Sequence, residues 1–464
     1  MNQLVLDRSN VYFSLFPDHL SYIDSCLETA SYKLKDYDNI SDFENDLANI
    51  NAYEHIDALE NPKNLIELDD KTLTKGDYIK AIKCLIEGKV FAEHFAAGEA
   101  TRLKLGTKFL INVQKDLSID KIAALINQEK GEGTMTSESL IRMYPCCNPL
   151  DLLPLSLGVR HMLQYSYDIY RLSKRFGYDP QEVLSKQTML IVLNESTADI
   201  IIDEFITNKF YGFARQNVLF MIQESYHGIN LKNKEVFYDR HTPKRLHNHG
   251  HIAIEQTMFN QIFHITENQN RNYLTCDQFG DILKNMEIKI SYNIEDLDYL
   301  TGSIDHEALA LALKKNNEHY NMLMEVVPNN PDSPQKGGMA AFDRILGQDV
   351  MIESFQLNGI ENHQIQFLNK NINYYLTPHI AWEMVKTQGL KMHVAVKDGF
   401  VYFQPVIGDI NFLVKTAIFT RKNARPIKAW KSASTTPLAI NCMHMQDKQK
   451  GFKEYARLFL GLIS

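Results

Sequence analysis

The sequence predicts an α/β protein in which a layered region of strands and helices follows a helical segment. From about residue 88, short apolar runs alternate with longer amphipathic stretches, which is the pattern of strands and helices that pack in layers. The stretches expected to form helices are 152–176 and 197–208. The runs expected to form strands are 89–96, 189–193, 218–222, 299–304 and 322–327, with further strands at 399–405 and 410–420.

Composition along the chain suggests three parts. We expect a helical N-terminal region at 1–85, a central α/β domain at 86–395 and a small β-rich C-terminal domain at 396–464. Residues 1–80 hold 16 acidic and 7 basic side chains, whereas residues 391–464 hold 4 acidic and 12 basic ones. The basic segment could meet phosphate groups, or it could form a solvated face or dock against another segment.

Bulk properties exclude several classes of protein. A chain of 464 residues with 44% hydrophobic residues can bury a large core, and a net charge of −8 gives no sign of a nucleic-acid surface. No apolar stretch is long enough to span a bilayer, and the first residues lack the pattern of a secretory signal. Six cysteines without CxxC spacing indicate reduced thiols, so we expect a cytoplasmic protein; its oligomeric state is left open.

A turn of small residues follows the first expected strand. Ala97 and Gly98 would let backbone amides approach a nucleotide closely, and Arg102 and Lys108 lie beyond them as cations for phosphate oxygens. An ordinary connection between a strand and a helix is the alternative interpretation.

Residues 189–256 hold a second group of polar side chains. Gln223 ends a strand, where its amide could pair with a uracil edge as both donor and acceptor. His247, His249 and His251 alternate and would share one face of a strand, which leaves a transition-metal site or a structural histidine cluster as alternatives.

The stretch 299–342 carries an aspartate that could hold a metal. Asp305 is expected at the carboxyl end of a central strand, where open α/β sheets bind ligands, and it could hold Mg²⁺ against a triphosphate. The alternative is a helix N-cap. Further on, Asn369 and Asn371 could bond sugar hydroxyls or be turn residues, and Lys428 could meet phosphates or lie on a basic surface loop.

Seven segments between about residues 85 and 435 resemble, in order, the eukaryotic-type UDP-sugar pyrophosphorylases. Gly98, Arg102 and Lys108 match the signature A-G-G-x-G-T-R-L with its downstream P-K, although Ala97 replaces a glycine. Gln223 matches the glutamine of F-x-Q.

His249 and Gly250 match the histidine–glycine pair of G-H-G-D, with Asn248 in place of a glycine and His251 in place of the aspartate. The stretch 299–342 resembles a run of I-D-N-L, M-E-V and K-G-G, which gives Asp305, Glu325 and Gly338. The last two segments resemble F-N-T-N-N and P-V-K and contain Asn369, Asn371 and Lys428.

This resemblance implies a Rossmann-like mixed sheet of the nucleotidyltransferase (GT-A-like) type. It also implies a reaction in which UTP and a sugar 1-phosphate give a UDP-sugar and pyrophosphate, with Mg²⁺ as the cofactor on Asp305. The implied catalytic residues are Arg102, Lys108 and Lys428. The implied nucleotide-binding residues are Ala97, Gly98, Gln223, Asn248, His249 and Gly250, and the sugar-binding ones are Glu325, Gly338, Asn369 and Asn371.

Three other functions remain open on this sequence. The changed glycines and His251 allow a UDP-sugar-binding pseudoenzyme, or a transferase with the same cleft and a different acceptor. The histidine tract allows a metallohydrolase.

Overall fold

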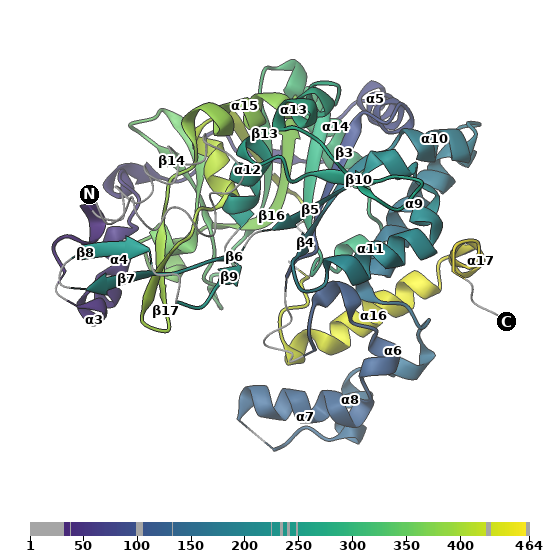
Figure 1. Cartoon of the computed structure of the whole chain (residues 1–464), viewed down its shortest axis with the longest axis horizontal. Helices are drawn as coiled ribbons and strands as arrows, with labels where there is room; N and C mark the ends of the chain where they lie inside the picture. The colour runs from purple at the N-terminus through teal and green to yellow at the C-terminus, as the bar shows by residue number, and fades with distance from the viewer. Residues whose placement is uncertain are drawn as a thin grey trace.

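The structure is a computed structural model of the chain (Figure 1). Two predicted site residues, Arg102 and Asn248, lie outside the residues that it describes. The described residues are 32–37, 39–98, 105–131, 133–223, 225–232, 235–238, 242–246, 249–423 and 428–460.

A mixed sheet forms the centre of the molecule, as predicted. Its strands run in the order β11-β10-β5-β4-β3-β12-β16-β13-β19-β2, and β14, with β1 and β15 on its sides, joins beside β16. Seven strands are parallel, while β16 lies antiparallel between β12 and β13. The strands are β1 (Leu59–Glu60), β2 (Ile66–Leu68), β3 (Val90–Phe95), β4 (Thr188–Asn194), β5 (Val218–Gln223), β10 (Phe263–Ile265), β11 (Arg271–Tyr273), β12 (Ile288–Asn293), β13 (Met322–Pro328), β14 (Met339–Asp343), β15 (Gln348–Ile352), β16 (Phe367–Leu376) and β19 (Thr416–Arg421).

Helices cover both faces of this sheet, because alternate residues of each buried strand point to opposite sides. Met189 and Ile191 of β4 belong to one core, whereas Leu190 and Val192 belong to the other. The helices on the face of Leu190 are α12 (His249–Met258), α13 (Cys276–Lys284) and α15 (Pro378–Gln388). Those packed in the core of Met189 include α5 (Lys75–Ile86), α9 (Leu157–Arg175), α10 (Pro180–Lys186), α11 (Ala198–Thr207), α14 (His306–Asn317), α16 (Thr436–Asp447) and α17 (Phe452–Arg457).

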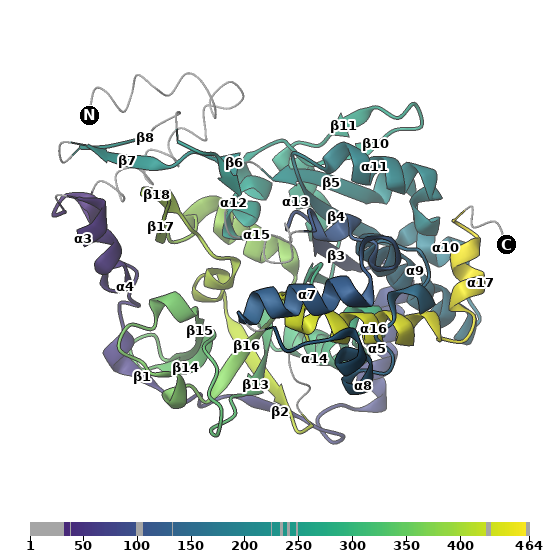
Figure 2. The same cartoon turned by 90° about the horizontal axis from the view of Figure 1, so that it is seen from below.

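A smaller sheet stands at one end of the molecule. It has the order β17-β18-β7-β8, and Leu34 and Phe43 of the N-terminal region pack on it. Figure 2 shows β7 and β8 extending past α12 at this end, with α3 nearby. The elements are α3 (Ile40–Asn45), α4 (Leu47–Ile50), β7 (Ile229–Lys232), β8 (Glu235–Tyr238), β17 (Val394–Lys397) and β18 (Phe400–Phe403), and the short pair β6 (Ser225–Tyr226) and β9 (Arg245–Leu246) lies next to α12.

An arm of short helices projects from the other side of the sheet. Figure 1 shows it below the body of the molecule. It consists of α6 (Val113–Asp116), α7 (Ile119–Lys130) and α8 (Ser137–Met143), and α7 contacts the turn that precedes α16. Within the described ranges, no helix is both long and apolar enough to cross a membrane.

Two details of the predicted fold differ from the structure. The strand expected at 299–304 is wrong, because Asp298–Leu300 form a short 3-10 helix and the loop then continues to α14. The strand in that part of the sheet is β12, eleven residues earlier. The strand expected at 410–420 is shorter, since Ile407–Phe412 form a second 3-10 helix before β19. Because β19 pairs with β13 and β2, the C-terminal segment contributes to the central sheet as well as to the small one.

Candidate functional site

The candidate site is built from the carboxyl ends of the parallel strands β3, β4, β5 and β12. Parallel strands end at the same edge, so the loops that follow them gather there. Asn194 ends β4 opposite Gln223, which ends β5, and both side chains are buried. The predicted nucleotide-binding residues Ala97 and Gly98 follow β3 and Gln223 ends β5, so they lie at the same edge of the sheet on either side of β4.

Asn194 fixes the turn after β3. Its amide donates to the carbonyl oxygen of Ala97 at 3.0 Å, while its carbonyl oxygen accepts from the backbone of Thr197 at 3.0 Å. The backbone N–H of Lys108 donates to the carbonyl of Gly98 at 3.1 Å, which closes the loop between them. A buried asparagine at a strand end was the sequence signal for this role, and the sequence interpretation did not use it.

Lys108, Glu295 and Lys431 form a cluster at this edge, which we call the Glu295 cluster. One carboxylate oxygen of Glu295 pairs with the ammonium of Lys108, and the other lies 3.1 Å from that of Lys431. Burial acts to raise the pKa of Glu295, but the two lysine charges and their hydrogen bonds outweigh it and hold that pKa below its ordinary value. Glu295 and Lys431 were not predicted from the sequence.

Helix α12 begins beside this cluster. His249 is its first residue, and its ring stacks on Phe95 with the ring centres 4.8 Å apart. Loss of solvation among the surrounding protein atoms lowers the pKa of His249. The charges of Glu295 and Glu93 act to raise this pKa, whereas those of Lys431 and Lys108 act to lower it. The next residue, Gly250, has a packing role, because an added Cβ would lie 2.4 Å from the carbonyl carbon of Pro405.

His247 of the histidine tract lies outside the described residues, and the expectation that the other two share one face of a strand is wrong. His249 and His251 both lie on α12, where residues two apart point in nearly opposite directions. His251 is buried against Tyr226, with ring centres 4.4 Å apart. Among the described residues, no group of three or more His, Cys, Asp or Glu could hold a metal ion.

The residues predicted to bind the sugar lie around β13 and β16. Asn369 is buried, and its side-chain oxygen accepts from the backbone N–H of Asn371 at 2.9 Å. The backbone of Asn371 has a positive φ of 61°. Asparagine tolerates this conformation better than most residues. Gly338 leaves room for its neighbours, since an added Cβ would lie 3.2 Å from the Cβ of Asn369. Asn369 and Gly338 therefore lie together, as the sequence suggested.

Glu353 is a further acidic residue on this side, and the sequence interpretation missed it. Its carboxylate lies between Gly338 and Gly408, where an added Cβ would be 3.5 Å and 3.2 Å from its oxygens. Burial and the nearby Asp409 charge raise the pKa of Glu353 to about 7, although a hydrogen bond from Asn369 acts to lower it. The carboxyl can therefore donate or accept a hydrogen bond near neutral pH.

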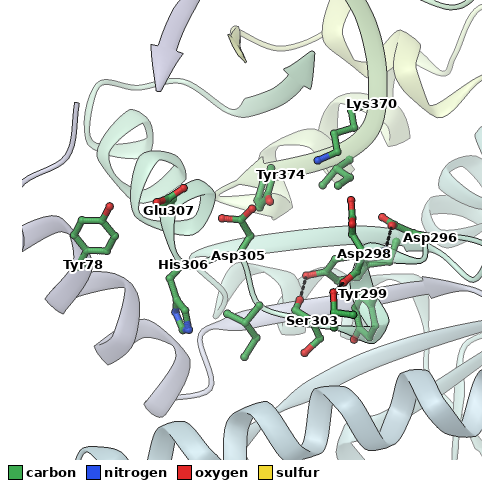
Figure 3. A pocket seen from close by; sticks show the side chains of 15 residues that line it. Tyr78, Asp296, Asp298, Tyr299, Ser303, Asp305, His306, Glu307, Lys370 and Tyr374 are labelled. Atoms are coloured by element: carbon green, nitrogen blue, oxygen red, sulfur yellow. Dashed lines mark hydrogen bonds between the residues drawn. The ribbon is translucent and has the colours of Figure 1, made fainter. Parts of the chain in front are cut away.

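A pocket of about 440 Å³ opens on the side of α14. Figure 3 shows Lys370, Asp305 and Tyr374 facing one space, with Asp296 and Asp298 beside it. Burial and the charge of Asp298 raise the pKa of Asp296 to about 6. None of Lys108, Glu295 and Lys431 lines this pocket.

Asp305 is fully engaged in this pocket. One of its oxygens accepts from the backbone of Ala308 at 3.0 Å as the N-cap of α14, and the other lies 2.6 Å from the guanidinium of Arg421. It does not follow a strand directly, because β12 ends at Asn293. Each oxygen keeps a further lone pair, so a Mg²⁺ ion would compete with Arg421 for this carboxylate, and the metal role of Asp305 stays a prediction.

Arg421 also pairs with Glu325, a residue that was predicted to bind the sugar. The side chain of Glu325 is buried, 2.8 Å from Arg421 and 3.3 Å from Lys370, at a shift in the pairing between β13 and β16. Two cations therefore already satisfy this carboxylate.

A short backbone partition separates the Glu295 cluster from the pocket. Asp296 forms an antiparallel β-bridge with Ala429. The N–H of Leu297 donates to the carbonyl oxygen of Lys428 at 3.0 Å, and the N–H of Trp430 donates to the carbonyl oxygen of Glu295 at 2.9 Å. The ammonium of Lys428 lies 3.1 Å from Asp298, which lines the pocket. The predicted cations Lys108 and Lys428 thus have partners on different sides of the partition, and their shared role around one triphosphate stays a prediction.

With this geometry described, the chain can be compared with known proteins. The sequence matches no protein-family model and no curated protein. Among solved structures, the UDP-N-acetylglucosamine pyrophosphorylase of Trypanosoma brucei, bound to an inhibitor, is 12% identical with a TM-score of 0.56, over 83% of this chain and 72% of that one.

A putative UDP-N-acetylglucosamine pyrophosphorylase of Entamoeba histolytica is 13% identical with a TM-score of 0.51, over 80% of this chain and 86% of that one. The chain has the fold of the UDP-sugar pyrophosphorylases. A variant of the Leishmania major UDP-glucose pyrophosphorylase in complex with UDP-glucose is also similar, with 14% identity and a TM-score of 0.50, over 82% of this chain and 70% of that one. At these identities the likeness is one of fold.

Proposed function

We propose that this protein is a UTP:sugar-1-phosphate uridylyltransferase, which forms a UDP-sugar and pyrophosphate. One observation carries the proposal. The cation Lys108, the turn at Gly98 and the buried amide of Gln223 lie at one edge of a sheet with the pyrophosphorylase fold, on either side of the end of β4. That edge is where sheets of this kind bind ligands.

The proposed reaction needs charge neutralisation and positioning more than acid–base chemistry. An anionic oxygen of the sugar phosphate attacks the α-phosphorus of UTP, a new P–O bond forms, and the bond to the β-phosphate breaks with its electron pair leaving on pyrophosphate. Lys108 would offset the charge on the phosphates, as would the predicted Arg102, which lies outside the described residues.

The same geometry supports roles in binding. Gln223 would pair with the uracil edge, and the backbone at Gly98 would lie against the nucleotide. Glu353 and Asn369 would hold the sugar hydroxyls, because a carboxyl with a pKa of about 7 and an amide both donate and accept hydrogen bonds. Mg²⁺ would enter with UTP, and Asp305 would have to share its carboxylate between this ion and Arg421 to bind it.

The test is a screen of UTP and Mg²⁺ with a panel of sugar 1-phosphates, including those of glucose and N-acetylglucosamine, with pyrophosphate release as the readout. We expect release with at least one sugar, and its loss when EDTA removes Mg²⁺. If no sugar gives pyrophosphate while calorimetry shows UDP-sugar binding, the protein is a binding module or a transferase with another acceptor.

We further propose that the reaction takes place in the cytoplasm. All the cysteines that the structure describes are free thiols, as expected for a reducing compartment. Fractionation of cells that produce the protein tests this, and recovery in an oxidising compartment would contradict it.

A further inference from the structure

The Glu295 cluster holds more positive than negative charge. One carboxylate faces two ammonium groups, and no other acidic side chain among the described residues forms an ion pair with Lys108 or Lys431. Lys108 is linked through its backbone to the turn at Gly98. The cluster is thus a site where an anionic ligand could take the place of one half-buried carboxylate.

Lys431 combines a fixed backbone with an accessible ammonium. The neighbouring Trp430 is buried, and its indole N–H donates to Thr436 at 3.0 Å. The backbone N–H of Trp430 donates to the backbone carbonyl oxygen of Glu295 at 2.9 Å. The side chain of Lys431, however, is 48% exposed, so it can move from Glu295 to a ligand without disturbing the core.

Lys431 also lies near residues of both predicted halves of the substrate site. Its charge acts on the pKa of His249, at the start of α12, and on that of Glu353, next to Asn369. A phosphate that joins a nucleotide to a sugar would lie between these two sets of residues. Lys428, by contrast, is paired with Asp298 on the pocket side of the partition.

We propose that Lys431 binds the phosphate groups of the substrates, and that Glu295 is the counter-ion that holds Lys431 and Lys108 until phosphate replaces it. This inference rests on the proposed function and identifies a further residue of its site. A triphosphate carries more charge than one carboxylate and competes effectively for both ammonium groups. No covalent bond changes in this exchange.

The experiment measures the binding of inorganic pyrophosphate to the full chain by calorimetry, with EDTA present. We expect Lys431→Ala to weaken binding by about tenfold or more, the usual size for one charged contact, and Lys431→Arg to restore most of it. Glu295→Gln should tighten binding severalfold, because the amide no longer competes for the two lysines. The exposed Lys422→Ala is the matched control and should bind as the wild type does.

The opposite signs at positions 431 and 295 separate this exchange from a structural effect, since damage to the fold would weaken binding in both variants. The inference is overturned if the wild type does not bind pyrophosphate, if Lys431→Ala binds it normally, or if Lys428→Ala loses more affinity than Lys431→Ala.

Turnover distinguishes this inference from the proposed function. If pyrophosphate binding depends on Lys431 but no sugar phosphate gives turnover, the inference holds and the proposed function fails. If the wild type turns over and Lys431→Ala does so at the same rate, the function holds and the inference fails.

Discussion

Single residues at the candidate site combine packing with predicted chemistry. Gly250 matches a nucleotide-binding motif, yet its contacts show that the absence of a side chain is needed for α12 to approach Pro405. Asn369 matches a sugar-binding motif, and its amide also holds the backbone of Asn371 and the carboxyl of Glu353. A motif match therefore does not by itself separate a ligand contact from a structural one.

Gly250→Ala should destabilise the protein by roughly 1–3 kcal/mol, because the added methyl group meets backbone atoms that cannot rotate away. Chemical denaturation measures the change. Gly133→Ala is the control, since nothing lies within 4 Å of its added Cβ. Equal stability of the two variants would contradict the packing role of Gly250.

Gln223→Ala should reduce the preference for UTP over CTP by at least about tenfold, since a buried amide that pairs with the base contributes on the order of 1–3 kcal/mol. Competition between the two nucleotides measures it, and a melting curve checks that the variant folds. An unchanged preference would exclude Gln223 from base recognition.

At the scale of elements, α14 begins at a hub of charges. Asp305 caps the helix, and Arg421 from the end of β19 joins Asp305, Glu307 and Glu325. The hub links the first turn of α14 to two strands of the sheet. Asp305 therefore has a structural role that is independent of any metal.

Asp305→Ala should lower the free energy of unfolding by about 1–2 kcal/mol, the usual cost of losing an N-cap, whereas Asp305→Asn keeps the cap and should cost less. Urea denaturation compares the two. If Asp305 acts only as a cap and partner of Arg421, Asp305→Asn should keep most of the turnover; a loss of about 100-fold in both variants would restore the metal role.

The element scale also shows why part of the fold was predictable. The runs at 189–193 and 218–222 are continuously apolar, the run at 322–327 is apolar apart from Glu325, and each proved to be a buried strand. Strand β12 was missed because Lys289 and Ser291 make it look half exposed. Both are buried, since they pair with Glu93 on β3. A polar pair across two strands cannot be recognised from either strand alone.

The strand prediction at 299–304 was wrong for the opposite reason. Tyr299 and Leu300 are buried, yet they lie in a 3-10 turn, and the hydroxyl of Tyr299 meets His94 on β3 at 3.2 Å. Burial alone does not distinguish a strand from a packed loop.

At the scale of the whole molecule, buried carboxyls make stability depend on pH. The pKa of Glu353 is about 7, and that of Glu204 is also raised to about 7, mainly by burial. Between the unfolded pKa and 7, the folded protein keeps protons that the unfolded chain has lost. The free energy of unfolding therefore falls as pH rises through this window.

Glu353→Gln removes one of these groups. The free energy of unfolding of this variant minus that of the wild type should therefore be about 1–3 kcal/mol higher at pH 8 than at pH 5. Denaturation curves at the two pH values measure this difference. The exposed Glu267→Gln is the surface control. The same offset between Glu353→Gln and the wild type at both pH values would contradict a raised pKa.

The partition between the Glu295 cluster and the pocket has a consequence for how this chain can vary. Glu295 contacts the lysines on one side, while its neighbour Asp296, together with Asp298, lines the acidic space on the other. The backbone of this stretch pairs with the segment 428–430, since Asp296 bridges Ala429 and the carbonyl oxygen of Glu295 accepts from the N–H of Trp430. A one-residue insertion or deletion after Asn293 would shift this pairing and move the carboxylate of Glu295 away from the two lysines. This stretch can accept substitutions, but its length is constrained.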